Sequence, residues 1–151
     1  MAAAPPPPLV DDPLTAFFWD GARRGELWIQ RCRACGTYIH LPRPVCRVCR
    51  SFDLVGERVS GRGTLYSWTQ TFKAFHPFFV DRVPYVLATV ALVEQPGLHL
   101  VTNLVGIDAD RVAADATLDM EVEVAFDEVA PGYVLPVFRP LATTTAAGAA
   151  S

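Results

Sequence analysis

The chain has 151 residues, of which 51% are hydrophobic and 19% charged, and its formal net charge at pH 7 is −3. This balance is typical of a globular protein and excludes a disordered or collagen-like chain. No run of about 18 apolar residues occurs, so the sequence predicts no membrane-spanning helix. The first residues lack the basic and apolar regions of a secretory signal, and we therefore expect a cytoplasmic protein.

The net charge conceals three unlike blocks. Residues 1–22 carry −3, residues 23–62 carry nine arginines and a net +6, and residues 63–151 carry −6. The basic block also holds all four cysteines of the chain, arranged as two Cys-x-x-Cys pairs. We therefore expect one local cysteine site within the basic part of the chain.

The first predicted element is a short amphipathic helix within residues 12–26. Asp12 is placed to cap it, Pro13 suits the first helical position, and Gly25 can close it. Its apolar face is formed by Leu14, Phe17, Phe18 and Ala22, with Trp19 beside it. A helix this short is unstable alone, so it must dock either on its own domain or on a partner.

A cysteine module at 27–60 follows, and then the pattern changes to β-strands. Strands are predicted at 64–72, 85–94, 98–105, 118–127 and 133–138, with a short helix from Asp108 between the third and the fourth. This order predicts a mainly β fold with a five-stranded OB-type barrel over residues 61–139. A single-sheet meander is the main alternative, but the inserted helix favours a barrel, where it can plug one open end. Residues 1–11 and 140–151 have the composition of flexible tails.

The two cysteine pairs predict a metal site. Two residues between cysteines let both thiolates reach one ion, and two such knuckles complete a tetrahedron around zinc. Gly36 suits a tight knuckle because it tolerates a positive φ. A disulfide framework is less favoured in a reducing cytoplasm, and colourless protein would exclude a rubredoxin-like iron centre. Four protein ligands leave no open position for water, so we expect one structural zinc ion held by Cys32, Cys35, Cys46 and Cys49.

Motifs for catalysis are lacking. His40, His76 and His99 are scattered, and no nucleophile elbow, phosphate loop or paired-histidine motif occurs. We therefore predict no catalytic residue. The most unusual segment is 72–79, where four of eight residues are phenylalanine, between the first two strands of the predicted barrel. Such a loop either folds back as a lid on the barrel or forms an interface with another protein.

Single-stranded nucleic acid is the main alternative ligand. Tyr66, Trp68 and Phe72 fall on one face of the first barrel strand, as a stacking platform requires. The same rings fill a barrel core equally well. We favour the core interpretation, because the barrel is acidic and Lys73 is the only lysine in the chain.

The order of these motifs resembles a known family. The helix, the ribbon with Cys32-x-x-Cys35-Gly36 and Cys46-x-x-Cys49, the junction Gly61-Arg62-Gly63-Thr64-Leu65-Tyr66-Ser67-Trp68-Thr69 and the segment Val83-Pro84-Tyr85-Val86 are similar to the acyl-CoA-associated zinc-ribbon OB-fold family. The resemblance covers residues 12–139. It implies a rubredoxin-like zinc ribbon followed by an OB-fold barrel, in an obligate accessory subunit of a thiolase-like or enoyl-CoA hydratase-like enzyme.

The resemblance extends to several branches of that family. The most similar one pairs with a thiolase-fold, lipid-transfer-protein-like enzyme in actinobacterial steroid side-chain degradation, where the pair acts as a retro-aldolase on a β-hydroxyacyl-CoA. Other branches serve archaeal acetoacetyl-CoA thiolase and hydroxymethylglutaryl-CoA synthase assemblies, or a bacterial ketone acyltransferase complex. Each implies a hetero-oligomer with an acyl-CoA substrate, and none implies a membrane.

A docking subunit needs apolar anchors and arginines of complementary charge. We expect the partner interface at Phe17, Phe18, Trp19, Phe75, Phe78 and Phe79. Arg62, Lys73 and Arg82 flank the aromatic loop and are candidates for contacts with CoA phosphates, with solvated surface charges as the simpler interpretation. An electron carrier is a weaker alternative, which zinc in place of iron would exclude.

Overall fold

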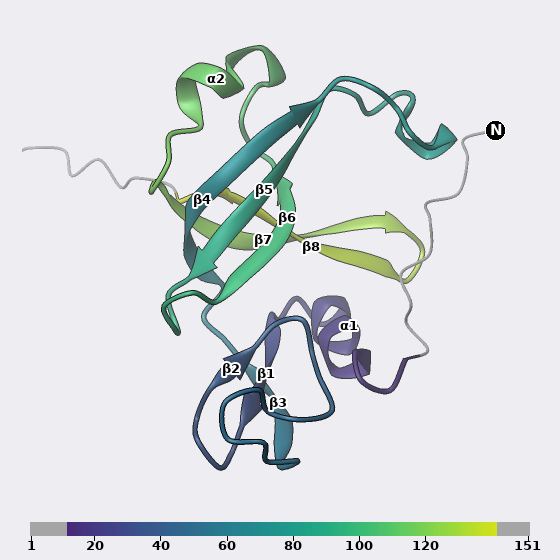
Figure 1. Ribbon diagram of the computed structural model, residues 1–151. Helices are drawn as coiled ribbons and strands as arrows, with labels where there is room; N and C mark the ends of the chain where they lie inside the picture. Colours follow the sequence, from purple (N-terminus) through teal and green to yellow (C-terminus); the bar gives the residue numbers. More distant parts are fainter. Residues whose placement is uncertain (1–11, 142–151) are drawn as a thin grey trace, which may run out of the picture.

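The computed structural model describes residues 12–141 and consists of a small cysteine-bearing sheet, a helix and a barrel (Figure 1). The small sheet, called the ribbon below, lies under the barrel, and helix α1 (Ala16–Arg23) lies beside the ribbon beneath strand β8. Residues 1–11 and 142–151, predicted as tails, lie outside the described residues. No helix within residues 12–141 has the length and apolar character needed to cross a bilayer.

Helix α1 starts later than predicted. Asp12 does not cap it, because the segment that follows forms a turn in which the Leu14 N–H donates to the Asp12 side chain at 2.9 Å. The other end matches the prediction, since Gly25 takes a positive φ of 71°. The N–H of Gly25 donates to Ala22 and that of Glu26 donates to Gly21, each at 2.9 Å, which is the Schellman pattern that satisfies the last carbonyls of a helix.

The ribbon has three antiparallel strands in the order β2-β1-β3. These are β1 (Trp28–Cys32), β2 (Tyr38–Ile39) and β3 (Leu54–Arg58). Helix α1 packs closely on this sheet at Gly56, where an added Cβ would lie 2.6 Å from the ring of Phe17. Only glycine permits that approach.

The barrel is closed, with the strand order β4-β5-β6-β8-β7. Its strands are β4 (Arg62–Thr71), β5 (Tyr85–Leu92), β6 (His99–Leu104), β7 (Glu121–Ala130) and β8 (Tyr133–Pro140). Antiparallel pairing of β4 with β7 and a parallel contact between β6 and β8 close the ring, as in OB-type barrels. The predicted barrel is confirmed, and the single-sheet meander is wrong.

The element between β6 and β7 covers one end of the barrel, as expected. It consists of the 3-10 helix η2 (Ala109–Arg111) and helix α2 (Val112–Asp115), and Val112 is fully buried in the core. Strand β7 starts three residues later than predicted. Leu118 is 61% exposed and Asp119 takes a positive φ of 64°, so residues 118–119 form a turn instead of continuing the alternation of the strand. At the other end, Pro140 still belongs to β8, so the predicted C-terminal tail does not begin there.

An irregularity in β4 overturns the expected arrangement of its aromatic residues. The pairing with β5 shifts between Leu65 and Ser67, which leaves Tyr66 56% exposed while Leu65 is fully buried. Trp68 packs against the core and donates its indole N–H to Ala116 at 2.8 Å. Phe72, beyond the strand end, is 72% exposed. The three rings therefore neither share one face nor fill the core together.

One hydrophobic core runs from the ribbon into the barrel. Leu27 and Ile29 of the ribbon belong to the same buried cluster as Leu65, Val90 and Phe138 of the barrel. A second and smaller cluster lies in the ribbon, where Cys32, Ile39 and Cys46 are buried beside Leu54. The ribbon and the barrel therefore form one packed unit, and the cysteines occupy the part of it that has the fewest apolar side chains.

Candidate metal centre and apolar pocket

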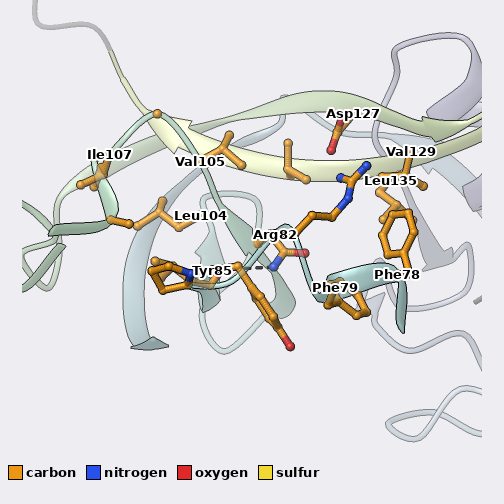
Figure 2. Close-up of a pocket in the computed structure, with 16 residues that line it drawn as sticks. Phe78, Phe79, Arg82, Tyr85, Leu104, Val105, Ile107, Asp127, Val129 and Leu135 are labelled. Atoms are coloured by element: carbon orange, nitrogen blue, oxygen red, sulfur yellow. Dashed lines mark hydrogen bonds between the residues drawn. The ribbon is translucent and has the colours of Figure 1, made fainter. Parts of the chain in front are cut away.

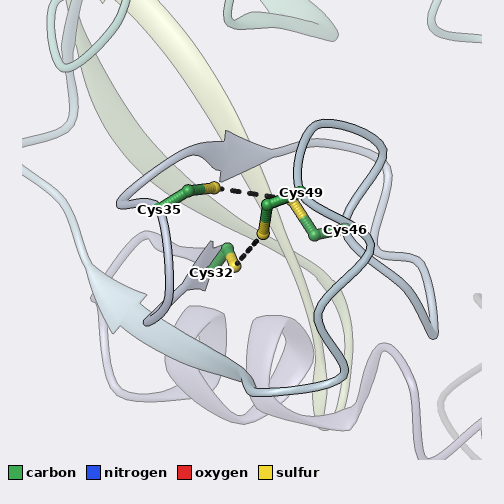
Figure 3. Close-up of side chains that lie close together, drawn as sticks. All are labelled: Cys32, Cys35, Cys46 and Cys49. Atoms are coloured by element: carbon green, nitrogen blue, oxygen red, sulfur yellow. Dashed lines mark hydrogen bonds between the residues drawn. The ribbon is translucent and has the colours of Figure 1, made fainter.

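Two knuckles of equal construction hold the four cysteines (Figure 3). In the first knuckle, the Gly36 N–H donates to Cys32 at 2.8 Å and the Cys32 N–H donates to Thr37 at 2.9 Å. In the second, the equivalent bonds run from Arg50 to Cys46 and from Cys46 to Ser51, both at 2.9 Å. The repeated pattern aims both cysteine pairs at one point between the two loops.

The four sulfur atoms lie at the spacing that a tetrahedral ion requires. All four Sγ atoms lie within 4.8 Å of one another, with Cys32 and Cys49 at 3.5 Å and Cys35 and Cys46 at 3.6 Å. Four sulfurs placed at about 2.3 Å from one zinc ion are about 3.8 Å apart, so the cluster fits the ion with little adjustment. All four cysteines are free thiols, so the disulfide interpretation is wrong.

In the absence of an ion, the four neighbouring thiols do not share one pKa. Hydrogen bonds with the side chain and the backbone of Thr37 lower the pKa of Cys35 to about 6. At Cys49 a backbone hydrogen bond from Ser51 lowers the pKa of the thiol. Desolvation and the neighbouring sulfurs together outweigh this effect, and the pKa is raised to about 12. Neighbouring thiolates repel one another, and a divalent ion removes that repulsion by binding all four.

A polar network supports the first knuckle from the sheet. Arg31 donates to both carboxylate oxygens of Glu57, at 2.8 and 2.9 Å, and also to the Gly36 carbonyl at 3.1 Å. The hydroxyl of Tyr38 donates to Glu57 at 2.6 Å, and this bond together with Arg31 lowers the pKa of the Glu57 carboxyl. The network ties the turn after Cys35 to strand β3.

Two glutamine side chains each form a pair of hydrogen bonds with the backbone N–H and C=O of one residue, as a neighbouring strand would. The Gln30 amide donates to the Arg43 carbonyl and accepts from the Arg43 N–H, both at 2.9 Å, and so holds the loop before the second knuckle. Gln95, in the β5–β6 turn of the barrel, accepts from the Tyr38 N–H at 2.9 Å and donates to the Tyr38 carbonyl at 3.2 Å. Strand β2 of the ribbon is thereby fastened to the barrel.

A pocket of about 390 Å³ lies on the barrel, and all of its lining residues come after the cysteines in the sequence (Figure 2). It is bounded by the β4–β5 loop (residues 72–84), the start of β5, the end of β6 with the segment that follows it (residues 105–109), and the β7–β8 hairpin. Most of its wall is apolar, with two charged groups, Arg82 and Asp127, which Figure 2 shows reaching toward one another. OB folds bind their ligands on this face, between the loop that joins strands 1 and 2 and the loop that joins strands 4 and 5.

The β4–β5 loop divides its phenylalanines between two environments. Phe78 and Phe79 line the pocket from the 3-10 helix η1 (Pro77–Phe79), and the guanidinium of Arg82 lies 4.2 Å from the ring centre of Phe78. Phe72 and Phe75 point outward, with exposed fractions of 72% and 77%. Two of the phenylalanines therefore fold back onto the barrel, as the lid interpretation expects, while the interface with another protein stays a prediction for the two exposed ones.

The other sequence-predicted residues do not all come together. Phe17 covers Gly56, while Phe18 packs against the core and contacts Trp19 edge-to-face at 4.9 Å, so these helix aromatics have partners within the chain. Lys73 lies over the ring of Phe75 at 5.7 Å. Arg62 starts β4 and so lies roughly 30 Å of strand away from the loop that follows β4, at about 3.3 Å per residue. It does not flank the aromatic loop in space.

Family models match most of the chain. Residues 19–55 match the model described as the ChsH2 rubredoxin-like zinc ribbon domain, and residues 56–127 match the one described as the ChsH2 C-terminal OB-fold domain. The zinc-ribbon match and the geometry of the four sulfurs agree on a site for one zinc ion.

Two curated relatives are each 42% identical to the chain. A probable enoyl-CoA hydratase alpha subunit from Thermomonospora curvata aligns over 125 residues, 83% of this chain and 37% of the relative. A 3-oxo-4,17-pregnadiene-20-carboxyl-CoA hydratase alpha subunit from Mycobacterium tuberculosis aligns over 101 residues, 66% of this chain and 30% of the relative. The chain thus spans about a third of the length of the curated relatives it matches.

Two solved structures share the fold. A chain of a structure titled Ltp2-ChsH2(DUF35) aldolase superposes with a TM-score of 0.77 at 40% identity, over 89% of this chain and 98% of that one. A DUF35-family protein of unknown function from Sulfolobus solfataricus superposes with a TM-score of 0.57 at 13% identity, over 85% of this chain and 86% of that one, and supports the fold alone.

Proposed function

The chain belongs to the ChsH2 family of zinc-ribbon and OB-fold proteins, and we propose that it is a non-catalytic accessory subunit of a thiolase-like, CoA-dependent enzyme. The observation that carries this proposal is the 40% identical match to nearly the whole of a chain from the Ltp2-ChsH2 aldolase. The reaction of the complex is the cleavage of a β-hydroxyacyl-CoA, and the curated relative that acts on a pregnadiene-carboxyl-CoA indicates a steroid acyl group.

The metal centre fits a supporting role. Four thiolate ligands close the coordination sphere of a zinc ion, which leaves no position for a substrate or an activated water. Zinc when bound therefore supplies folding free energy, and the chain's own cysteines hold the two knuckles together. Free thiols persist in a reducing compartment, so we propose a cytoplasmic location.

The exposed end of the β4–β5 loop is the surface that we assign to the partner. Phe72, Phe75 and Val80 are 72%, 77% and 58% exposed, which places three large apolar side chains together in one loop. Aromatic anchors of this kind carry much of the binding energy of protein interfaces. Phe78 and Phe79 line the pocket, and Phe17 and Phe18 are occupied within the chain, so we expect smaller contributions from them.

Lys73 and Arg82 remain our candidates for contacts with CoA phosphates, because both belong to this loop. Arg62 cannot join them from the opposite end of β4. The alternative function, binding of single-stranded nucleic acid, has less support. Tyr66 stacks on His99 at 4.4 Å while Trp68 is fixed against the core, so β4 offers no row of free rings for bases.

Co-purification with the thiolase-like enzyme from the same organism tests the proposal. Phe75→Asp should weaken the complex about 30-fold or more, because it buries a charge in place of an aromatic anchor. Phe52→Asp is the matched control, since Phe52 lies in the ribbon and is 79% exposed. A complex that survives Phe75→Asp but not Phe52→Asp would move the interface to the ribbon. Absence of any complex with the unmodified chain would refute the accessory role.

A further inference from the structure

The pocket beneath the β4–β5 loop has the position of a ligand site but an unusual lining. Strands β5 and β6 are the second and third strands of the barrel, and the pocket lies against them between the two loops with which OB folds bind oligonucleotides and oligosaccharides. Its wall consists mainly of aliphatic and aromatic side chains, among them Phe79, Leu104, Ile107 and Leu135. Neither phosphates nor sugar hydroxyls find enough partners on such a wall.

The shortage of polar groups also argues against a peptide as the occupant. Every residue of a peptide brings an N–H and a C=O that need hydrogen bonds. The Asn103 amide in the pocket already donates to the Val86 carbonyl at 3.2 Å, and the remaining charged or hydroxyl-bearing side chains of the wall are Arg82, Tyr85 and Asp127. A compact hydrocarbon body makes no such demand. The volume of about 390 Å³ is within the range of about 300–1,000 Å³ usual for small-molecule sites.

The charged groups at the pocket indicate how such a ligand is oriented. Arg82 and Asp127 are both exposed, so they mark the mouth of the pocket. The Arg82 guanidinium lies over Phe78, and within residues 12–141 it forms no ion pair with a carboxylate. Its N–H groups are therefore available to an oxygen at the polar end of a ligand whose apolar body lies deeper.

We propose that this pocket binds the fused hydrocarbon rings of the steroid acyl thioester. The proposal rests on the function proposed above and adds a role to it. The accessory subunit holds the apolar rings, while the side chain and its thioester extend past Arg82 toward the enzyme docked on Phe72 and Phe75. The pocket-lining and the exposed phenylalanines belong to one loop, so the pocket for the steroid rings and the surface for the partner are neighbours.

Equilibrium dialysis of the complete chain against radiolabelled progesterone, a neutral 3-oxo steroid, tests this directly. We expect micromolar binding by the unmodified chain and at least tenfold weaker binding by Val129→Trp, which fills the pocket. Val101→Trp is the matched control, because Val101 is 72% exposed on β6 and lies outside the pocket. It should bind within twofold of the unmodified chain. If Val129→Trp does not fold, Val105→Trp fills the same pocket from its rim.

The outcomes separate this inference from the accessory role, because dialysis needs no partner. Lack of progesterone binding, or equal loss with both tryptophan variants, overturns the ring site, even where the complex with the enzyme still forms. Equally tight binding of dodecanoate would overturn the assignment to fused rings in favour of flexible chains. Ring binding without any enzyme complex would leave the pocket established and refute the accessory role instead.

Discussion

The ribbon and the barrel are stabilised in different ways. The barrel closes on itself around a core that includes the fully buried Leu65, Val90 and Phe138. The ribbon's own cluster has Ile39 as its only fully buried aliphatic residue among those described, next to two metal-ligating cysteines. Apolar burial therefore suffices to stabilise the barrel. The ribbon needs its metal ion, the Arg31–Glu57 ion pair and the backbone hydrogen bonds of the Gln30 and Gln95 side chains. Small modules with little core commonly depend on such additions.

Loss of a metal ligand should have the largest effect, because it should destabilise the ribbon and leave the barrel folded. Cys46→Ser removes one of the four sulfurs, and we expect loss of bound zinc and of about 5 kcal/mol or more of ribbon stability. Metal content and hydrogen exchange across β1–β3 measure the two effects. Val48→Ser alters an exposed position between Cys46 and Cys49 and should keep the zinc. A Cys46→Ser chain with full metal content and a protected ribbon would contradict the structural role of the ion.

The second prediction concerns pH. Burial lowers the pKa of His40, a ribbon residue near the ring of Phe18, to about 4 from an ordinary value of 6.5. Between pH 6.5 and pH 4 the unfolded chain binds a proton that the folded chain does not, so stability falls as the pH decreases through this window. The loss amounts to at most about 1.4 kcal/mol per pH unit.

Comparison with His40→Phe isolates this contribution, because acid release of zinc affects both chains alike. Denaturant unfolding at pH 6.5 and 5.5 should show a smaller decrease for His40→Phe than for the unmodified chain. His99→Phe is the control, since His99 lies on strand β6 of the barrel, where its ring stacks on Tyr66. Equal decreases in the unmodified chain and in His40→Phe would show that the pKa of His40 is the same in the folded and the unfolded chain.

The junction between the two parts gives the third prediction. Gln95→Ala leaves the N–H and the C=O of Tyr38 without their barrel partner, which should cost about 1–3 kcal/mol. Exchange of the Tyr38 amide hydrogen should accelerate, while the core of the barrel stays protected. Gln70→Ala removes a single hydrogen bond to Ala109 within the barrel and should leave Tyr38 protected. Unchanged Tyr38 exchange in Gln95→Ala would mean that the apolar core alone holds the ribbon in place.

The smallest expected effect comes from a difference between the two knuckles. Gly36 and Arg50 take equivalent positions with φ of 76° and 61°, a region that costs a residue with a Cβ atom about 1–2 kcal/mol. Arg50→Gly should therefore stabilise the folded chain by up to about 1 kcal/mol, once the entropy of glycine in the unfolded chain is subtracted. Thermal unfolding of the zinc-bound protein measures this. Arg47→Gly, in the same loop without a positive φ, should destabilise, and a stabilising Arg47→Gly would discredit the conformational explanation.

Local patterns in the sequence were sufficient for much of the architecture. The Cys-x-x-Cys spacing identified the metal ligands, because two knuckles bring their own four sulfurs together almost regardless of the remaining fold. The order of strands and the inserted helix predicted the closed barrel. Errors occurred where a local irregularity broke the period. The shift at Tyr66 turned that ring outward, and the turn at Asp119 delayed β7.

Contacts between distant segments were beyond the reach of such patterns. Gln95 stood in an ordinary turn sequence, and nothing near it indicated that its amide pairs with Tyr38, 57 positions earlier. The same holds for the apolar pocket, whose walls come from four strands and two loops, and for the separation of Arg62 from Arg82.

The sequence by itself thus determined the metal ligands, the strand order and the family resemblance, since each depends on spacing along the chain. Only the tertiary structure decided which phenylalanines of residues 72–79 face solvent and which line a cavity. That division depends on where β6, β7 and β8 pass beneath the loop, because a ring is buried only where another segment covers it.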